Sequence, residues 1–120
     1  MLVDAHAHLD MFGDRLAEAI RQIDDHHILT LAVAMDVPSY LVTKSLASRS
    51  PWIRPLFGVH PWEAPRYADD LRALDEPLAE TPMIGEAGLD FHFVEDERSH
   101  ECQRRVFRYE CEWPSVWANA

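Results

Sequence analysis

Two histidines near the amino terminus have the spacing of a pair of metal ligands. His6 and His8 lie in the segment DAHAHLD (residues 4–10), and residues two apart on a strand project to the same side. Two imidazoles on one face repel each other when charged, whereas neutral imidazole is a good ligand for Zn and Mn. A pair of surface or capping histidines is the alternative interpretation. The flanking carboxylates of Asp4 and Asp10 favour a metal site.

A glutamate between two glycines is the second feature that could carry chemistry. In the segment MIGEAGLDFH (residues 83–92), Glu86 directly follows a short apolar run that ends in glycine. A carboxylate at a strand end can bridge two metal ions about 3.5–4 Å apart, and such a pair polarises a phosphate and activates water. A capping or loop glutamate is the alternative. Together with the histidine pair, the pattern predicts that Glu86 is a metal ligand and a catalytic residue.

Two further histidines follow predicted strands. His60 lies in FGVHPW (residues 57–62), where it could orient a substrate, bind its phosphate or ligate a metal. A structural histidine held by a backbone carbonyl is the alternative. We predict a catalytic and substrate-placing role for His60 and a substrate-facing role for His92. The remaining histidines fall on predicted helices or at their ends and receive no role: His26, His27 and His100.

These groups need a scaffold that brings several strand ends together. Strand-like apolar runs alternate with helical stretches along the chain, which is typical of βα units around a parallel sheet. Strands are predicted at residues 1–6, 28–35, 52–58 and 83–85, and helices at 13–27, 41–47, 67–74 and 95–112. In such folds the functional groups gather at the carboxyl ends of the strands. Gly58, Gly85 and Gly88 stand at such ends, where glycine permits a sharp turn or a close approach.

The composition is that of a globular domain with an acidic balance. The 120 residues are 48% hydrophobic and 27% charged, and the formal net charge is -10. This charge argues against a basic nucleic-acid-binding surface but permits a phosphodiester substrate that reaches a bound cation. No apolar run approaches the about 18 residues of a membrane span, and the first residues lack the basic region of a signal peptide. We therefore expect a cytoplasmic protein that has no membrane partner.

The three segments together resemble motifs of the TatD family of amidohydrolase-like, metal-dependent hydrolases. LVDAHAHLD (2–10), GVHPW (58–62) and IGEAGLD (84–90) are similar to three successive motifs of that family in order and spacing. The resemblance covers residues 1–109, and Gln103 and Phe107 suit the family's following helix. It implies a TIM-type (β/α)8 barrel with two divalent metal ions (Mg, Mn or Zn) that hydrolyses phosphoester bonds, often as a 3′–5′ exonuclease-like deoxyribonuclease on DNA. On that pattern, His6 and His8 are ligands of the first metal and Glu86 bridges the two.

The chain departs from the family in its length. A full (β/α)8 barrel takes about 250 residues, and the family's later ligands, two histidines and an aspartate, have no counterparts here. The pattern predicts a truncated amino-terminal half with about four parallel strands. We expect residues 1–109 to form a partial hydrolase domain and residues 110–120 a divergent tail that follows a reading-frame change near Glu110. A half barrel exposes sheet edges and apolar helix faces, which favours self-association.

Two other functional interpretations stay open beside a TatD-type nuclease. Another enzyme of the amidohydrolase superfamily would hydrolyse amide or lactone bonds, but such enzymes usually have a lysine or another carboxylate where Glu86 stands. From a different class, a non-catalytic remnant would bind metal weakly or only associate with other chains. The sequence favours the metal-dependent hydrolase.

Overall fold

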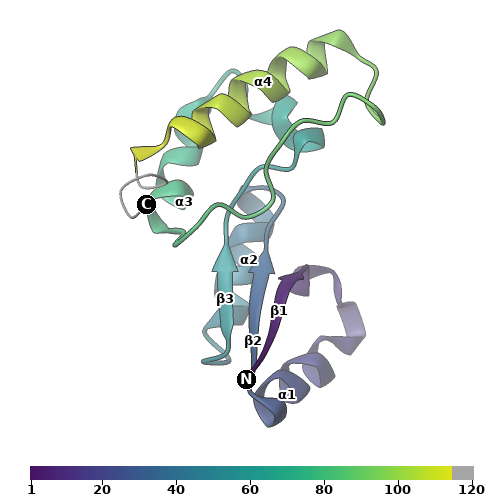
Figure 1. Ribbon diagram of the computed structural model, residues 1–120, viewed down its shortest axis with the longest axis vertical. Helices are drawn as coiled ribbons and strands as arrows, with labels where there is room; N and C mark the ends of the chain where they lie inside the picture. Colours follow the sequence, from purple (N-terminus) through teal and green to yellow (C-terminus); the bar gives the residue numbers. More distant parts are fainter. Residues whose placement is uncertain (115–120) are drawn as a thin grey trace.

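The computed structural model describes residues 1–114 as a small parallel sheet with helices that connect its strands (Figure 1). The strands are β1 (Leu2–Ala7), β2 (Ile28–Val33) and β3 (Ile53–Leu56). The helices are α1 (Leu16–His26), α2 (Val37–Ala47), α3 (Asp75–Glu80) and α4 (Glu97–Glu112). Short 3-10 turns occupy Leu9–Met11, Gly13–Arg15, Pro61–Arg66 and Leu71–Leu74.

The sheet has the order β1-β2-β3, and both strand pairs are parallel. The central strand β2 is almost wholly apolar, and Ala32 and Val33 within it are buried, as expected of a strand with a neighbour on each side. Helices α1 and α2 make the two crossovers. This is an α/β fold with the repeating βα units of a partial TIM-type barrel, as the sequence predicted.

Helix α1 begins three residues later than predicted. Gly13 has a φ of 55°, a left-handed conformation, and the following 3-10 turn delays the α-helix until Leu16. Ile20 and Ile23 of this helix are buried. His27, the last residue of the predicted helix, lies beyond α1, where it takes the left-handed C-cap position and stacks on Trp52.

The fourth predicted strand, at residues 83–85, is reduced to a single parallel bridge between Phe57 and Ile84. The Thr81 hydroxyl accepts from the Phe57 backbone N–H at 3.0 Å and donates to the Met83 carbonyl at 2.6 Å. A side chain therefore satisfies backbone groups that a strand ladder would otherwise pair. Gly85 still donates its N–H to the Phe57 carbonyl at 2.7 Å, which holds the segment beside the end of β3.

The helical region after β3 differs from the prediction in its boundaries. The predicted helix over 67–74 is a 3-10 turn at Leu71–Leu74, and α3 begins only at Asp75. Pro77 lies in the first turn of α3, where no backbone N–H is needed for an intrahelical bond. The last helix, predicted over 95–112, runs from Glu97 to Glu112.

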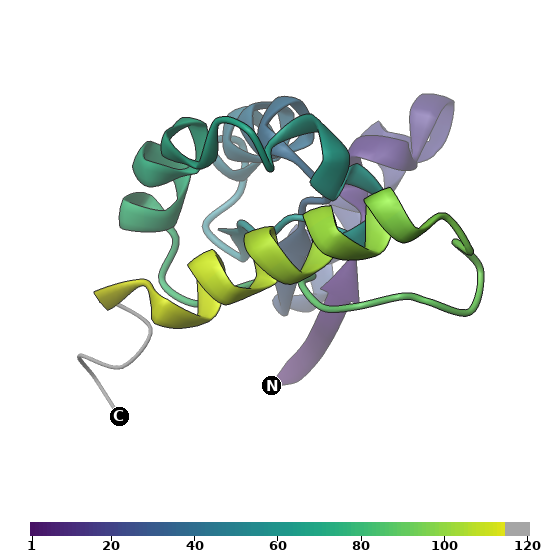
Figure 2. The same ribbon diagram turned by 90° about the horizontal axis from the view of Figure 1, so that it is seen from above.

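Helix α4 lies at the end of the sheet to which the strands point (Figure 1). Seen from that end, it runs alongside the helical turns that follow β3 (Figure 2), and it packs against Pro61–Arg66. A buried cluster that includes Phe57, Val59 and Val106 joins α4 to the rest of the chain. The segment that leads from Glu86 to α4 is thereby anchored at both of its ends.

The predicted boundary between residues 109 and 110 falls inside α4, and Glu110 is buried there. Residues 115–120 of the predicted tail lie outside the described residues. The domain division and the reading-frame change therefore stay predictions. In the part of the chain that is described, no helix is long and apolar enough to cross a membrane.

Candidate metal centre

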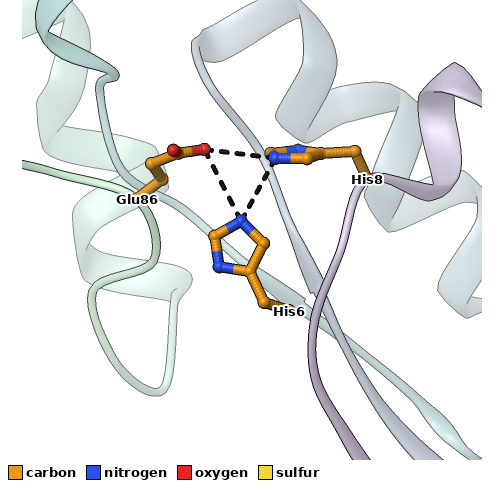
Figure 3. Close-up of side chains that lie close together, drawn as sticks. All are labelled: His6, His8 and Glu86. Carbon is orange, nitrogen blue, oxygen red and sulfur yellow. Dashed lines mark hydrogen bonds and ion pairs between the residues drawn. The ribbon is translucent and has the colours of Figure 1, made fainter.

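Three side chains from two separate segments converge at the carboxyl end of the sheet (Figure 3). His6 belongs to β1, His8 directly follows it, and Glu86 follows the bridge at Ile84. His8 Nε2 lies 3.2 Å from His6 Nε2 and 3.2 Å from Glu86 Oε2. His6 Nε2 lies 3.8 Å from the same carboxylate oxygen. The structure thus brings together the three residues that the sequence proposed as ligands.

A bulge in β1 sets the orientation of the His6 side chain. Between Asp4 and Ala7 the register against β2 shifts, because three residue steps of β1 oppose two of β2. The Asp4 carboxylate accepts from the His6 backbone N–H at 3.1 Å within this irregular segment. The two imidazole rings consequently meet edge to face, with centroids 4.9 Å apart, rather than side by side. Asp4 is therefore a supporting residue of the site.

The tautomer of the neutral His8 ring follows from the contact of its Nδ1 atom. His8 Nδ1 lies 3.0 Å from the carbonyl oxygen of Val33, which can only accept, so Nδ1 carries the hydrogen. In the neutral ring Nε2 then bears a lone pair, directed at the other two groups. This arrangement, in which the remaining ring N–H donates to a backbone carbonyl, is the usual second shell of a metal-ligating histidine.

The donor set fits a divalent cation. Glu86 Oε2 is buried and accepts no hydrogen bond from the described residues. A proton shared between His6 and His8 would satisfy the rings but would leave that oxygen without a partner, which is costly for a buried charge. A cation bound between the two imidazole nitrogens and the carboxylate oxygen would give each of these three atoms a partner. Such mixed nitrogen and oxygen ligands suit Zn and Mn.

His60 lies on the other side of the Glu86 carboxylate. Its Nδ1 accepts from the Trp62 backbone N–H at 3.2 Å, so in the neutral ring Nε2 carries the hydrogen. This Nε2 lies 3.8 Å from Glu86 Oε1. His60 therefore presents a hydrogen-bond donor to the site rather than a metal-binding lone pair. Of the roles left open by the sequence, this geometry favours substrate placement.

His92 lies apart from this group. Its backbone N–H donates to Asp90 at 3.0 Å, and its ring contacts Phe93, with centroids 4.7 Å apart. Within residues 1–114 the candidate metal-binding group contains the histidine pair and Glu86 without His92. The substrate-facing role of His92 stays a prediction.

Gly58 allows the end of β3 to approach the Glu86 backbone. A Cβ atom at Gly58 would lie 2.4 Å from the carbonyl oxygen of Glu86 and 3.0 Å from its nitrogen. No real Cβ contact is that short, so any side chain must push the Glu86 main chain away. The sequence predicted a sharp turn or a close approach at this glycine. Its close neighbour is instead the backbone of a residue that would bind one.

Replacing Gly58 with alanine is therefore expected to move Glu86. We expect Mn affinity to fall by about tenfold or more, because displaced ligand support typically costs that much. We also expect a loss of about 1–3 kcal/mol in the free energy of unfolding from overpacking. Calorimetric titration with Mn and urea denaturation measure the two effects.

Gly13→Ala is the matched control for this prediction. Gly13 has a left-handed backbone, but nothing lies within 4 Å of its added Cβ. That change should lower stability by about 1 kcal/mol through backbone strain and leave Mn affinity unchanged. Equal Mn affinity in Gly58→Ala and the unaltered chain would rule out the proposed displacement of Glu86.

A second set of supporting residues orders the segment after Glu86. The buried Gln103 side chain accepts from the Asp90 N–H at 2.7 Å and donates to the Asp90 carbonyl at 3.1 Å. The Asp90 carboxylate accepts from the backbone N–H groups of His92 and Phe93 and from the Trp62 indole. These bonds, the one from Phe93 foremost, hold the pKa of Asp90 below its ordinary value. From the sequence, Gln103 was expected only to suit the family's following helix, and a glutamine beside apolar helix positions is the signal that could have indicated this anchor.

Glu110 supports the site from α4. Its side chain is 1% exposed, and Oε1 accepts from the Val59 N–H at 2.7 Å, immediately before His60. Burial raises the pKa of Glu110 to about 8, since the contact with Val59 offsets only part of the desolvation. The sequence assigned Glu110 to the tail and gave it no role in the site.

Comparison with known proteins identifies the family of the chain. The family model described as TatD related DNase matches residues 3–118. A search of curated proteins gave no match. The matched stretch includes both histidines of the pair, His60 and Glu86, and the family consists of hydrolases that generally depend on metal ions. The chain belongs to the TatD-related DNase family.

Proposed function

We propose that this chain is a metal-dependent hydrolase of phosphoester bonds, of the TatD deoxyribonuclease type, with DNA as its substrate. The observation that carries the proposal is the convergence of His6, His8 and Glu86 around the buried oxygen Glu86 Oε2, which accepts no hydrogen bond from the described residues. Family membership supports the reaction class, and the acidic net charge is compatible with it when a cation meets the phosphate.

His6, His8 and Glu86 would hold the divalent ion through two imidazole nitrogens and one carboxylate oxygen. When bound, such an ion stabilises charge on a phosphoryl oxygen and makes water more acidic. The Val33 carbonyl keeps the His8 ring in the tautomer that ligation requires. His60 Nε2 lies 3.8 Å from Glu86 Oε1, so its N–H could donate to a phosphoryl oxygen beside Glu86 and place the substrate.

The test compares substrates and metals on the full chain. We expect nucleotide release from a single-stranded DNA oligonucleotide in Mn or Mg, loss of release on adding a chelator, and recovery on adding Mn. Turnover of an amide or lactone panel in place of DNA would assign the chain to another amidohydrolase activity. Calorimetric binding of Mn without any turnover would support the non-catalytic remnant.

The exposed edge of β1 supports a further proposal, self-association of two copies. In the described residues β1 pairs only with β2, and Leu2 and Val3 are more than half exposed on it. An open edge with apolar side chains readily pairs with another strand. We expect light scattering to give more than the monomer mass of 13.8 kDa, and Val3→Lys to restore the monomer. Val42→Lys, on the exposed side of α2, is the control, and a monomeric unaltered chain would contradict the proposal.

A further inference from the structure

Trp62 presents an aromatic ring at the rim of the candidate metal centre. Its ring meets that of His60 edge to face, with centroids 4.9 Å apart, and His60 Nε2 is 3.8 Å from Glu86. Trp62 is 52% exposed, although its indole N–H donates to Asp90 at 2.7 Å. Because the indole N–H is already hydrogen-bonded, the exposed side chain offers a ligand its apolar ring rather than a free donor.

The ring is held in place rather than left to rotate. The same Asp90 carboxylate that accepts from the indole also accepts from two backbone N–H groups. The buried Gln103 side chain holds the Asp90 backbone, since it accepts from the Asp90 N–H and donates to the Asp90 carbonyl. A charge-assisted bond of this kind is strong and directional. Ordering an exposed ring buries little surface and so adds little to folding, whereas a rigid aromatic surface lowers the cost of binding a flat ligand.

The charges around Trp62 disfavour a phosphate-binding role for this rim. Arg66, the cation of the same turn, is paired with Asp36 at 2.8 Å and with Glu63 at 2.9 Å. Asp90 adds a further negative charge next to the indole. A planar, weakly charged ligand is therefore the chemistry that this surface accepts. Nucleobases stack on aromatic side chains in this way, without a need for basic residues.

We propose that Trp62 stacks on an unpaired nucleobase of the strand whose phosphoester lies beside Glu86, and so selects nucleic acid over base-free phosphoesters. The inference rests on the proposed function, because it supplies the base-binding part of the same site. A single imidazole ring separates Trp62 from the Glu86 carboxylate, so one nucleotide can reach both. Stacking also predicts that binding weakens little as salt increases, in contrast to binding by basic residues.

The experiment measures fluorescence anisotropy of two labelled five-nucleotide probes in Mn, one an oligothymidylate and the other its abasic counterpart, both with phosphorothioate linkages that resist cleavage. We expect Trp62→Ala to weaken oligothymidylate binding about 5- to 100-fold, the loss typical of one stacked base. Trp62→Phe should keep most of the affinity. The abasic probe should bind weakly to the unaltered chain and be indifferent to either change. Phe93→Ala, at an aromatic residue that is 76% exposed, is the matched control and should change neither probe.

Calorimetric Mn titration and thermal melts check that each variant keeps its fold and metal site. Equal oligothymidylate affinity in Trp62→Ala and the unaltered chain would overturn the stacking role while leaving the nuclease proposal intact. Equal losses of affinity for both probes in Trp62→Ala would also overturn it, because the ring would then not be in contact with a base. If the unaltered chain binds Mn but neither binds nor cleaves DNA, the proposed function fails and the stacking role fails with it.

Discussion

Glu86→Gln is expected to lower the affinity of the chain for Mn by about 100-fold or more. Loss of a residue that merely supports a ligand costs about 10- to 100-fold, and Glu86 supplies both a ligand atom and the negative charge of the cluster. Glutamine has nearly the same shape, so the change removes charge with little effect on packing. Calorimetric titration with Mn gives the affinity directly. Phosphodiester cleavage should be lost together with binding.

The same variant should change stability in opposite directions with and without metal. In chelator, Glu86→Gln should melt at a higher temperature than the unaltered chain, because it removes a partly buried carboxylate whose Oε2 accepts no hydrogen bond from the described residues. In excess Mn the order should reverse, since only a chain that binds the ion is stabilised by it. Glu63→Gln, at a glutamate paired with Arg66, is the control and should leave Mn affinity unchanged. Unchanged Mn affinity in Glu86→Gln would contradict the metal centre itself.

The side chains of the candidate site were predictable because they depend on short-range rules. His6 and His8 are two residues apart on a strand, and Glu86 follows an apolar run at the same end of a parallel sheet. Periodicity and the direction of the strands therefore suffice to bring them together. The bulge that turns the His6 ring was not predictable, because it arises from pairing with β2 and from the Asp4 side chain.

The supporting residues depend on long-range contacts that the sequence does not reveal. Gly58 was noticed as a glycine at a strand end, but the need for it comes from the Glu86 backbone, 28 positions away in the sequence. The predicted fourth strand does not form for a similar reason: the Thr81 hydroxyl accepts from the Phe57 backbone N–H, which a strand ladder would otherwise use. The role of Glu110 was not predicted, because it depends on a contact with Val59, 51 positions away in the sequence.

Glu110→Gln is expected to reduce the pH dependence of stability between about pH 4.5 and pH 8. Burial raises the pKa of Glu110 to about 8 in the folded chain from its ordinary value of 4.5. Between these values the folded chain keeps a proton that the unfolded chain releases. The contribution to stability is therefore complete below about pH 4.5 and is lost as pH rises toward 8, at up to about 1.4 kcal/mol per pH unit.

Glutamine has the shape of the protonated glutamate and can accept from the Val59 N–H in the same way. Glu110→Gln should thus match the unaltered chain near pH 4.5 and exceed its free energy of unfolding by about 2–4 kcal/mol at pH 7.5. Urea denaturation at pH 4.5, 6, 7.5 and 9 measures the difference. Glu112→Gln, an exposed position on the same helix, should not alter the pH profile. Parallel pH profiles for Glu110→Gln and the unaltered chain would mean that Glu110 is not held neutral in the fold. The hydrogen bond that positions Val59, and the adjacent His60, would then be accepted by a charged carboxylate.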